Sequence, residues 1–154
     1  MTATITITNP ILSGMYPDPS WIWDDEFQRI VLVTSTFELV PGLPIYVSED
    51  MTCWKHVSNV IDADLARRLL IPFVDDSGGV YAPTLRRIHG KYVIACTIAR
   101  LDDRRAMEGG CTESELMRFH AAEGNFILEA DSIEGPWRGP FWIEGAEGID
   151  PDKF

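Results

Sequence analysis

The sequence predicts an all-β fold built from short strands joined by turns. Glycine and proline are frequent, with 12 and 10 residues among 154, and this favours many turns over long helices. Similar strand openings recur at 18–20, 82–84 and 150–152. About four short strands follow each of the first two openings, which is the content of one β-propeller blade.

Local patterns give the expected elements in order. Alternating or β-branched runs predict strands, namely 2–8, 20–23, 29–35, 44–48, 54–57, 84–88, 91–97, 126–130 and 140–143. Turns or loops are expected at 41–42, 75–79 and 89–90. One helix is expected over 62–70, because Asp62 suits its N-cap and Leu65 and Leu69 share one face. A second candidate helix, 112–122, lies in the long connection between the strands of the second unit.

The repeat has a consequence for domain organisation. Two blades and the first residues of a third account for the whole of 1–154. Propellers have at least four blades, so this ring would not close. We therefore expect residues 1–154 to form the incomplete N-terminal part of a longer domain.

Composition restricts the partners and the cofactors. The formal net charge of −11 argues against nucleic acid and anionic membranes, which both attract basic surfaces. No apolar run reaches transmembrane length and no signal-peptide pattern is seen, so we expect a cytoplasmic location. Three widely spaced cysteines and three histidines show no metal-ligand spacing, and no metal or other cofactor is expected.

One acidic residue lies in an unusually stiff segment. Asp18 is flanked by Pro17 and Pro19, just before an apolar run. Proline fixes its own φ and drives the preceding residue toward extended geometry, so Asp18 would be held rigidly at the start of a strand. A turn-forming aspartate at a strand start explains the same pattern, and on this motif alone it is the preferred interpretation.

The segment around Asp18 and six further short segments together resemble glycoside hydrolase family 43. This family consists of five-bladed propellers and includes β-xylosidases and α-L-arabinofuranosidases. Seven segments carry the resemblance in family order: 9–12, 16–20, 34–38, 78–83, 89–92, 133–137 and 148–151. They cover nearly the whole chain. The resemblance therefore implies about two blades of a five-bladed propeller and the start of a third.

The resemblance also assigns residues to roles. Asp18 resembles the general base of the family, and Asp150 resembles the aspartate that orients the catalytic acid and tunes its pKa. Phe37 resembles an aromatic wall of the sugar subsite. Tyr81 stands where many relatives have tryptophan, so the stacking surface is smaller here. The general acid of the family is a glutamate from a later blade, and this sequence contains no counterpart to it.

The implied activity is inverting, exo-acting hydrolysis of xylo-oligosaccharides. A different class stays open, in which the chain is a non-catalytic carbohydrate-binding or interaction module, or an inactive fragment. A second copy of the chain could complete the ring by self-association. Asp150 as a plain turn residue, and Phe37 and Tyr81 as core residues, remain alternatives to the roles that the family implies.

Overall fold

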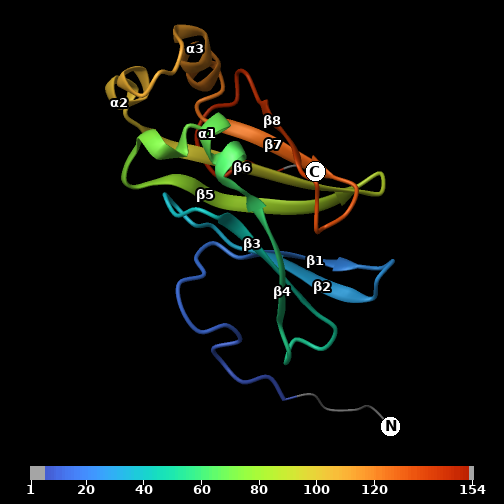
Figure 1. Ribbon diagram of the computed structural model, residues 1–154. Coiled ribbons are helices and arrows are strands. Elements are labelled where there is room, and N and C mark those ends of the chain that lie inside the picture. The colour runs from blue at the N-terminus through green and yellow to red at the C-terminus, as the bar shows by residue number, and fades with distance from the viewer. Residues whose placement is uncertain (1–5, 153–154) are drawn as a thin grey trace.

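The computed structural model describes residues 6–152, which form two four-stranded antiparallel sheets (Figure 1). The first sheet has the order β1 (Ser20–Asp24), β2 (Arg29–Val33), β3 (Gly42–Ser48) and β4 (Lys55–Ile61). The second has the order β5 (Val74–Ile88), β6 (Lys91–Leu101), β7 (Asn125–Ala130) and β8 (Arg138–Trp142). Each sheet is a meander of consecutive strands, so the all-β prediction is confirmed.

Short helices gather at one end of the sheets (upper left in Figure 1). Helix α1 (Ala63–Arg68) and the 3₁₀ helix η1 (Ile71–Phe73) connect the two sheets, while α2 (Asp103–Glu108) and α3 (Glu113–Ala121) lie between β6 and β7. The Asp62 side chain accepts a hydrogen bond from Leu65 N at 2.8 Å, which confirms it as the N-cap of α1. A capping box at Thr112 starts α3.

Two local predictions are wrong. Residues 6–8 form no strand, and the rest of the expected strand 2–8 lies outside the described residues. The expected loop at 75–79 belongs to β5, which opens with a bulge where the register with β6 shifts between Val74 and Gly79. The polar side chains that suggested a loop are exposed there, while the backbone still follows the strand.

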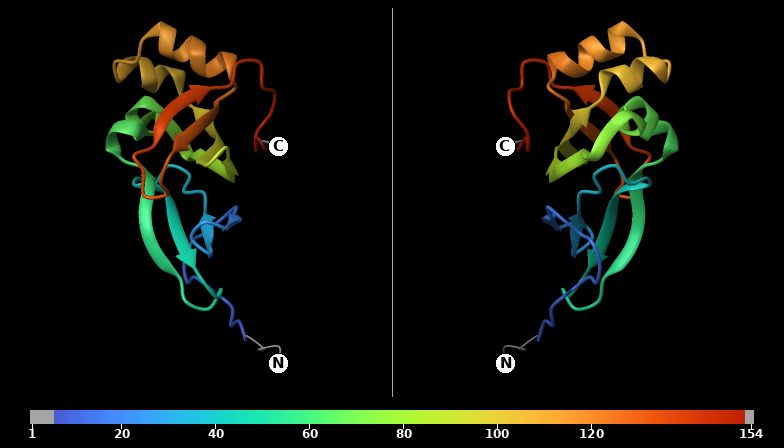
Figure 2. Two further views of the ribbon diagram at one scale, coloured as in Figure 1. Left: turned by 90° about the vertical axis from the view of Figure 1, so that its right-hand side faces the viewer. Right: turned by 90° about the vertical axis from the view of Figure 1, so that its left-hand side faces the viewer.

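The two sheets meet along their first strands, β1 and β5 (Figure 2). Leu85 N, on β5, donates a 3.0 Å hydrogen bond to Ser20 Oγ, on β1. One apolar core runs from this seam to the helices and contains buried residues of both sheets, among them Val31, Leu43, Ile45, Val80, Leu85, Ile94, Phe126 and Leu128. The seam therefore fixes the position of one sheet relative to the other.

A buried carboxylate joins the sheets at one end of the seam. Asp24, at the end of β1, is fully buried. Arg87 Nη1, from β5, lies 2.5 Å from Asp24 Oδ1, and the Tyr92 hydroxyl donates to Asp24 Oδ2. Arg29 Nε is 3.8 Å from the same Oδ2. Burying a charge is tolerated when it is paired and hydrogen-bonded in this way.

At the other end of the seam the two backbones themselves touch. Phe37 N donates to Val80 O at 3.1 Å, and Val80 N donates to Phe37 O at 2.9 Å. Gly79 has φ +93°, and a Cβ there would lie 2.3 Å from Phe37 O. Only glycine permits both this conformation and this close approach.

Replacing the buried carboxylate should destabilise the whole protein. We expect Asp24→Ala to lower the free energy of unfolding by about 1–3 kcal/mol, because the buried Tyr92 hydroxyl loses its acceptor and Arg87 keeps only the exposed Glu26 as its anion. The matched control is Asp25→Ala, which removes the exposed neighbouring carboxylate and should change stability by less than about 0.5 kcal/mol. Urea denaturation measures both, and equal effects would contradict the seam assignment.

Two glycines with similar φ separate backbone strain from close contact. Gly79 and Gly90 have φ +93° and +81°, but a Cβ at Gly90 would meet nothing within 4 Å. Either change to alanine adds strain of about 1–3 kcal/mol. We expect Gly79→Ala to cost clearly more than Gly90→Ala in thermal or urea unfolding, because only Gly79→Ala pushes Phe37 off Val80. A smaller loss at position 79 would refute this.

Candidate active site

Asp18 lies just before β1 and is tied to the end of β2. The Ser35 hydroxyl donates a 2.7 Å hydrogen bond to Asp18 Oδ2, and Ser35 N donates to Pro17 O at 3.0 Å. Ser35 is buried, whereas Asp18 is exposed. Asp18 has φ +50°, so its backbone is left-handed rather than extended as the flanking prolines suggested. Its carboxylate is therefore accessible to solvent, with one oxygen held by a buried hydroxyl.

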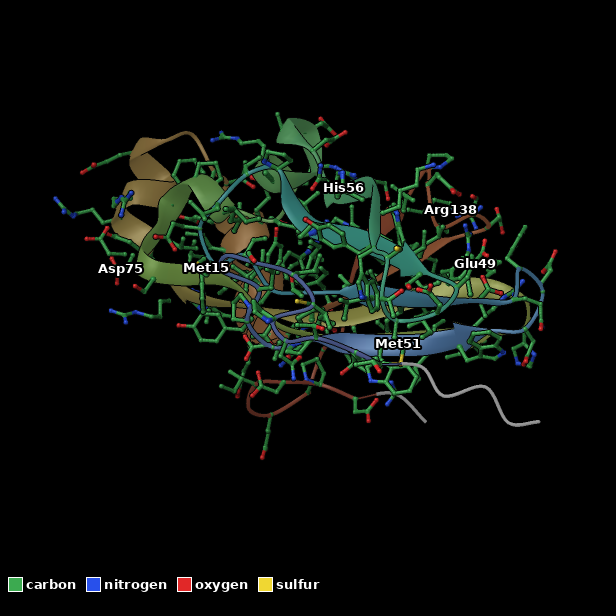
Figure 3. The ribbon with its side chains drawn as sticks, turned by 90° about the horizontal axis from the view of Figure 1, so that it is seen from below. Met15, Glu49, Met51, His56, Asp75 and Arg138 are labelled. Atoms are coloured by element: carbon green, nitrogen blue, oxygen red, sulfur yellow. The ribbon has the colours of Figure 1, made fainter. Side chains whose placement is uncertain are left out.

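This site lies at the end of the sheets that bears the helices. In Figure 3, Met15, close before Asp18 in the chain, lies toward the same end as Asp75 at the start of β5. Glu49 and Arg138 lie toward the other end. The turns β1–β2 and β7–β8 are at that far end, and so carry residues suited to control substitutions.

Phe37 and Tyr81 form an aromatic pair across the seam. Their ring centroids are 5.5 Å apart and the planes are perpendicular, which is a favourable edge-to-face arrangement. The Tyr81 hydroxyl donates to Ser77 O at 2.8 Å. Both side chains are partly exposed, so neither is a closed core residue. The pair presents a fixed aromatic surface beside the contact of Phe37 with Val80.

A buried thiol lies where these groups come together. Cys96, on β6, is fully buried, and its Sγ is 2.8 Å from Tyr81 O, to which the thiol donates. Burial raises the pKa of the Cys96 thiol well above its usual range, and the negative charges of Asp150 and Asp18 raise it further. Both carboxylates contribute to the same rise in pKa, although they come from opposite ends of the chain.

Asp150 reaches this place from the segment that follows β8. It is exposed, has φ +60°, and lies in residues 143–152, which form no helix or strand. In Figure 2 the C-terminal segment lies on the same side of the molecule as β1, with β4 on the opposite side. Cys96 thus contacts Tyr81, Phe37 packs against Tyr81, and the charges of Asp150 and Asp18 both raise the pKa of the Cys96 thiol.

Sequence reasoning missed two members of this group. Ser35 is part of the run at 34–38, yet nothing in that run indicates that its hydroxyl bonds to Asp18. Cys96 lies in an apolar strand buried on both faces, where a cysteine looks like any small core residue. Each contact depends on strand pairing within one sheet, β1 with β2 for Ser35 and β5 with β6 for Cys96.

Two hollows of the surface lie outside this group. One, of about 340 Å³, is mostly apolar and faces away from the second sheet; it is lined by residues that include Tyr16, Trp21, Ile30, Leu32 and Trp54. The other, of about 400 Å³, lies toward the far end and is lined by residues that include Arg29, Glu49, Lys55 and Glu134. Neither contains Asp18, Phe37, Tyr81 or Asp150 in its lining.

Residues 6–152 contain neither a candidate metal centre nor a helix suited to a membrane. This part of the chain holds no group of three or more histidine, cysteine, aspartate or glutamate side chains arranged to bind a metal ion. None of its helices has the length and apolar character needed to cross a membrane.

Comparison with known proteins gives one consistent result. The sequence model of the family described as "Glycosyl hydrolases family 43" matches residues 7–154. A "Xylan 1,3-beta-xylosidase" of Vibrio sp is 35% identical over 153 residues, covering 98% of this chain and 25% of that protein. A "Non-reducing end alpha-L-arabinofuranosidase" of Bacteroides ovatus is 35% identical over 148 residues, covering 95% and 23%.

Solved structures agree with the sequence comparison. The GH43 protein BlXynB of Bacillus licheniformis superimposes with a TM-score of 0.70 at 28% identity, over 94% of this chain and 26% of that one. The chain thus spans about a quarter of the length of these relatives. The family match extends over nearly all of its residues, and the chain belongs to glycosyl hydrolase family 43.

Proposed function

We propose that this chain supplies the general base and the orienting aspartate of an inverting, exo-acting β-xylosidase that cleaves xylo-oligosaccharides. Asp18 is the general base, and Asp150 orients the catalytic acid and tunes its pKa. The observation that carries the proposal is geometric: Asp18 is exposed, and one of its carboxylate oxygens accepts a 2.7 Å hydrogen bond from the buried Ser35 hydroxyl, two residues before Phe37 of the aromatic pair. The names of the relatives, xylosidases and arabinofuranosidases, support the substrate class.

The chemistry requires carboxyl groups in opposite roles. In an inverting glycosidase one carboxylate removes a proton from water while a carboxylic acid protonates the leaving oxygen, with about 6.5–9.5 Å between them. Asp18 suits the first role because it is exposed to water and the Ser35 hydroxyl fixes one of its oxygens. The attacking water would be held by the other carboxylate oxygen of Asp18, Oδ1.

Asp150 suits an electrostatic role. A carboxylic acid stays protonated near neutral pH when anions lie nearby, because they raise its pKa. Asp150 would provide such an anion next to Asp18. The acid itself would be a glutamate contributed from outside these residues, as the family resemblance implies.

Phe37 and Tyr81 would form the wall against which the sugar ring lies. Their edge-to-face contact and the hydrogen bond from the Tyr81 hydroxyl to Ser77 O hold the two rings in place without a ligand. Little ordering of these side chains would then be needed on binding, and this favours affinity for a small rigid sugar.

The architecture that fits this role is part of a five-bladed propeller, with two blades present and the start of a third. The proposal is supported by the two meander sheets packed along their first strands. It is also supported by the apolar hollow beside Trp21 and Trp54, on the face of the first sheet that the second sheet does not cover. A further blade, or a second copy of the chain, would cover this face.

A second candidate is a sugar-binding module without turnover. The observation that favours it is the aromatic pair of Phe37 and Tyr81, which is held in place by its own contacts and needs no catalytic group to stack against a sugar ring. A site with its aromatic wall but without an acid would bind sugar and not cleave it. Loss of general acid catalysis alone typically costs about 10²–10⁴ in rate.

Hydrolysis of nitrophenyl β-xyloside, measured on protein in which this chain is joined to the residues that supply the acid, separates the two candidates. We expect Asp18→Asn to lower the rate by about 10²–10⁴ because water loses its base. Asp25→Asn, an exposed carboxylate in the far β1–β2 turn, is the matched control and should leave the rate unchanged. NMR of the first product should show the inverted anomer of xylose.

Three outcomes count against the β-xylosidase. Full activity of Asp18→Asn would refute the role of Asp18, and a product with retained configuration would refute the inverting mechanism. Binding of xylobiose without hydrolysis, lost in Phe37→Ala, would instead establish the binding module.

A further inference from the structure

The segment that carries Asp150 has no strand or helix to hold it. Residues 143–152 follow β8 as irregular chain, and Ile149, next to Asp150, is 58% exposed. Fixing such a segment has an entropic cost at every residue, so it stays in one place only where specific contacts hold it. The contacts on each side of Asp150 are therefore informative.

The backbone N–H and C=O of Gly148 each form a hydrogen bond with a side chain. Gly148 N donates to Glu123 Oε2 at 2.9 Å, and Gly148 O accepts from Asn125 Nδ2 at 2.9 Å. Thr97 Oγ1 donates to Asn125 Oδ1 at 2.6 Å, which directs the amide nitrogen of Asn125 toward Gly148. Thr97 and Asn125 are buried and pair across β6 and β7, so this anchor is part of the sheet.

Asp152 is held from another strand. Arg86 Nη2, on β5, lies 2.7 Å and 2.8 Å from the two carboxylate oxygens of Asp152. Arg86 Nη1 also donates to Leu85 O at 2.9 Å, which fixes the direction of the guanidinium. Leu85 is the residue whose amide bonds to Ser20 on β1, so this anchor starts at the seam.

We propose that Glu123 and Asn125 on one side, and Arg86 on the other, are positioning residues that fix the place and direction of the Asp150 carboxylate. They act through the backbone on each side of Asp150 and do not touch the sugar. The inference rests on the role given above to Asp150. It adds that the role depends on two anchors from different strands, neither of which the family match identifies.

Two anchors are needed because one leaves the segment free to pivot. Gly148 and Asp150 both have positive φ, so the chain turns sharply between the anchors. Rotation of the segment about a single remaining anchor would therefore displace the Asp150 carboxylate. A misplacement of about 1 Å in a catalytic group can cost on the order of 10²-fold in rate. Release of either anchor should therefore be visible both in motion and in turnover.

The first experiment measures motion in the protein without substrate. Backbone ¹⁵N relaxation is recorded for wild type, Glu123→Ala, Arg86→Met and the control Arg138→Met. Arg138 forms a comparable exposed pair with Asp131 toward the far end of the sheets (Figure 3). We expect order parameters at 148–152 to fall from about 0.85 to below about 0.6 in the first two variants and to stay unchanged in the control.

The side chains replaced in Glu123→Ala and Arg86→Met are exposed to solvent, so both variants should keep the wild-type fold. Glu123 is exposed, and the Arg86 side chain is 36% exposed. Asn125→Asp, which keeps the bond from Thr97 and removes the donor to Gly148, is a further test at the buried position. Order parameters in β6 and β7 that match wild type would confirm that the change is local.

The second experiment measures turnover with the same nitrophenyl xyloside. We expect kcat to fall by about 10–10²-fold in Glu123→Ala and Arg86→Met, with KM within about threefold of wild type. Arg86→Lys, which keeps the positive charge, should restore part of the loss. The alkaline limb of the pH profile should move to lower pH, because the acid loses the anion that raises its pKa.

The outcomes separate the two proposals. Order parameters at 148–152 that match Arg138→Met in both variants overturn the positioning role. An increase in motion with unchanged kcat overturns it as well. A wild-type protein without hydrolysis overturns the β-xylosidase instead, and the relaxation data then decide alone whether the anchors hold Asp150.

Discussion

The contact between β1 and β5 is the constraint on which the rest of the structure depends. Asp18 belongs to the first sheet and Asp150 follows the last strand of the second, so neither sheet alone contains both carboxylates. Their relative position is set by the seam, which is fixed at three points along its length: Asp24 with Arg87, Ser20 with Leu85, and Phe37 with Val80. The geometry of the site is thus a property of sheet packing.

The two ends of this seam differ in chemistry. The far end buries a carboxylate among two guanidinium groups and the Tyr92 hydroxyl, and burial with the hydrogen bond to Asp24 raises the pKa of Tyr92 to about 12. The site end uses backbone contact at Gly79 and leaves its carboxylates exposed. Strong charge pairing therefore stabilises the seam at the end away from Asp18 and Asp150, and both of these residues stay exposed to solvent.

Much of the fold could be predicted because the local patterns agreed with it. The apolar run at 29–35, the turn at 89–90 and the N-cap at Asp62 each have a local physical cause, and each is found in the structure. The failures have causes that are not local. Polar residues at 75–79 suggested a loop, but pairing with β6 makes them part of a bulged strand. Helix α2 is only six residues long, too short for a periodic pattern.

The same division applies to the site. Asp18, Phe37, Tyr81 and Asp150 were named from the family resemblance, which no local pattern could replace. Ser35 contacts Asp18, and Cys96 contacts Tyr81, across neighbouring strands. Such contacts depend on strand order and register. The anchors depend on the same kind of contact. Glu123 bonds to Gly148 and Arg86 bonds to Asp152, and in each case at least two strands lie between the partners in the sequence.

The segment that contains α2 and α3 is an excursion from the second sheet between β6 and β7, and its two ends are joined by hydrogen bonds. Thr97 and Asn125 are paired at these ends, and Ile98 N donates to Gly124 O at 2.9 Å. Because the ends are already joined, doubling the length of the excursion would add only about 0.6 kcal/mol of closure entropy. Insertions, deletions or exchanges within this excursion should therefore cost little stability and leave the pairing of β6 with β7 intact.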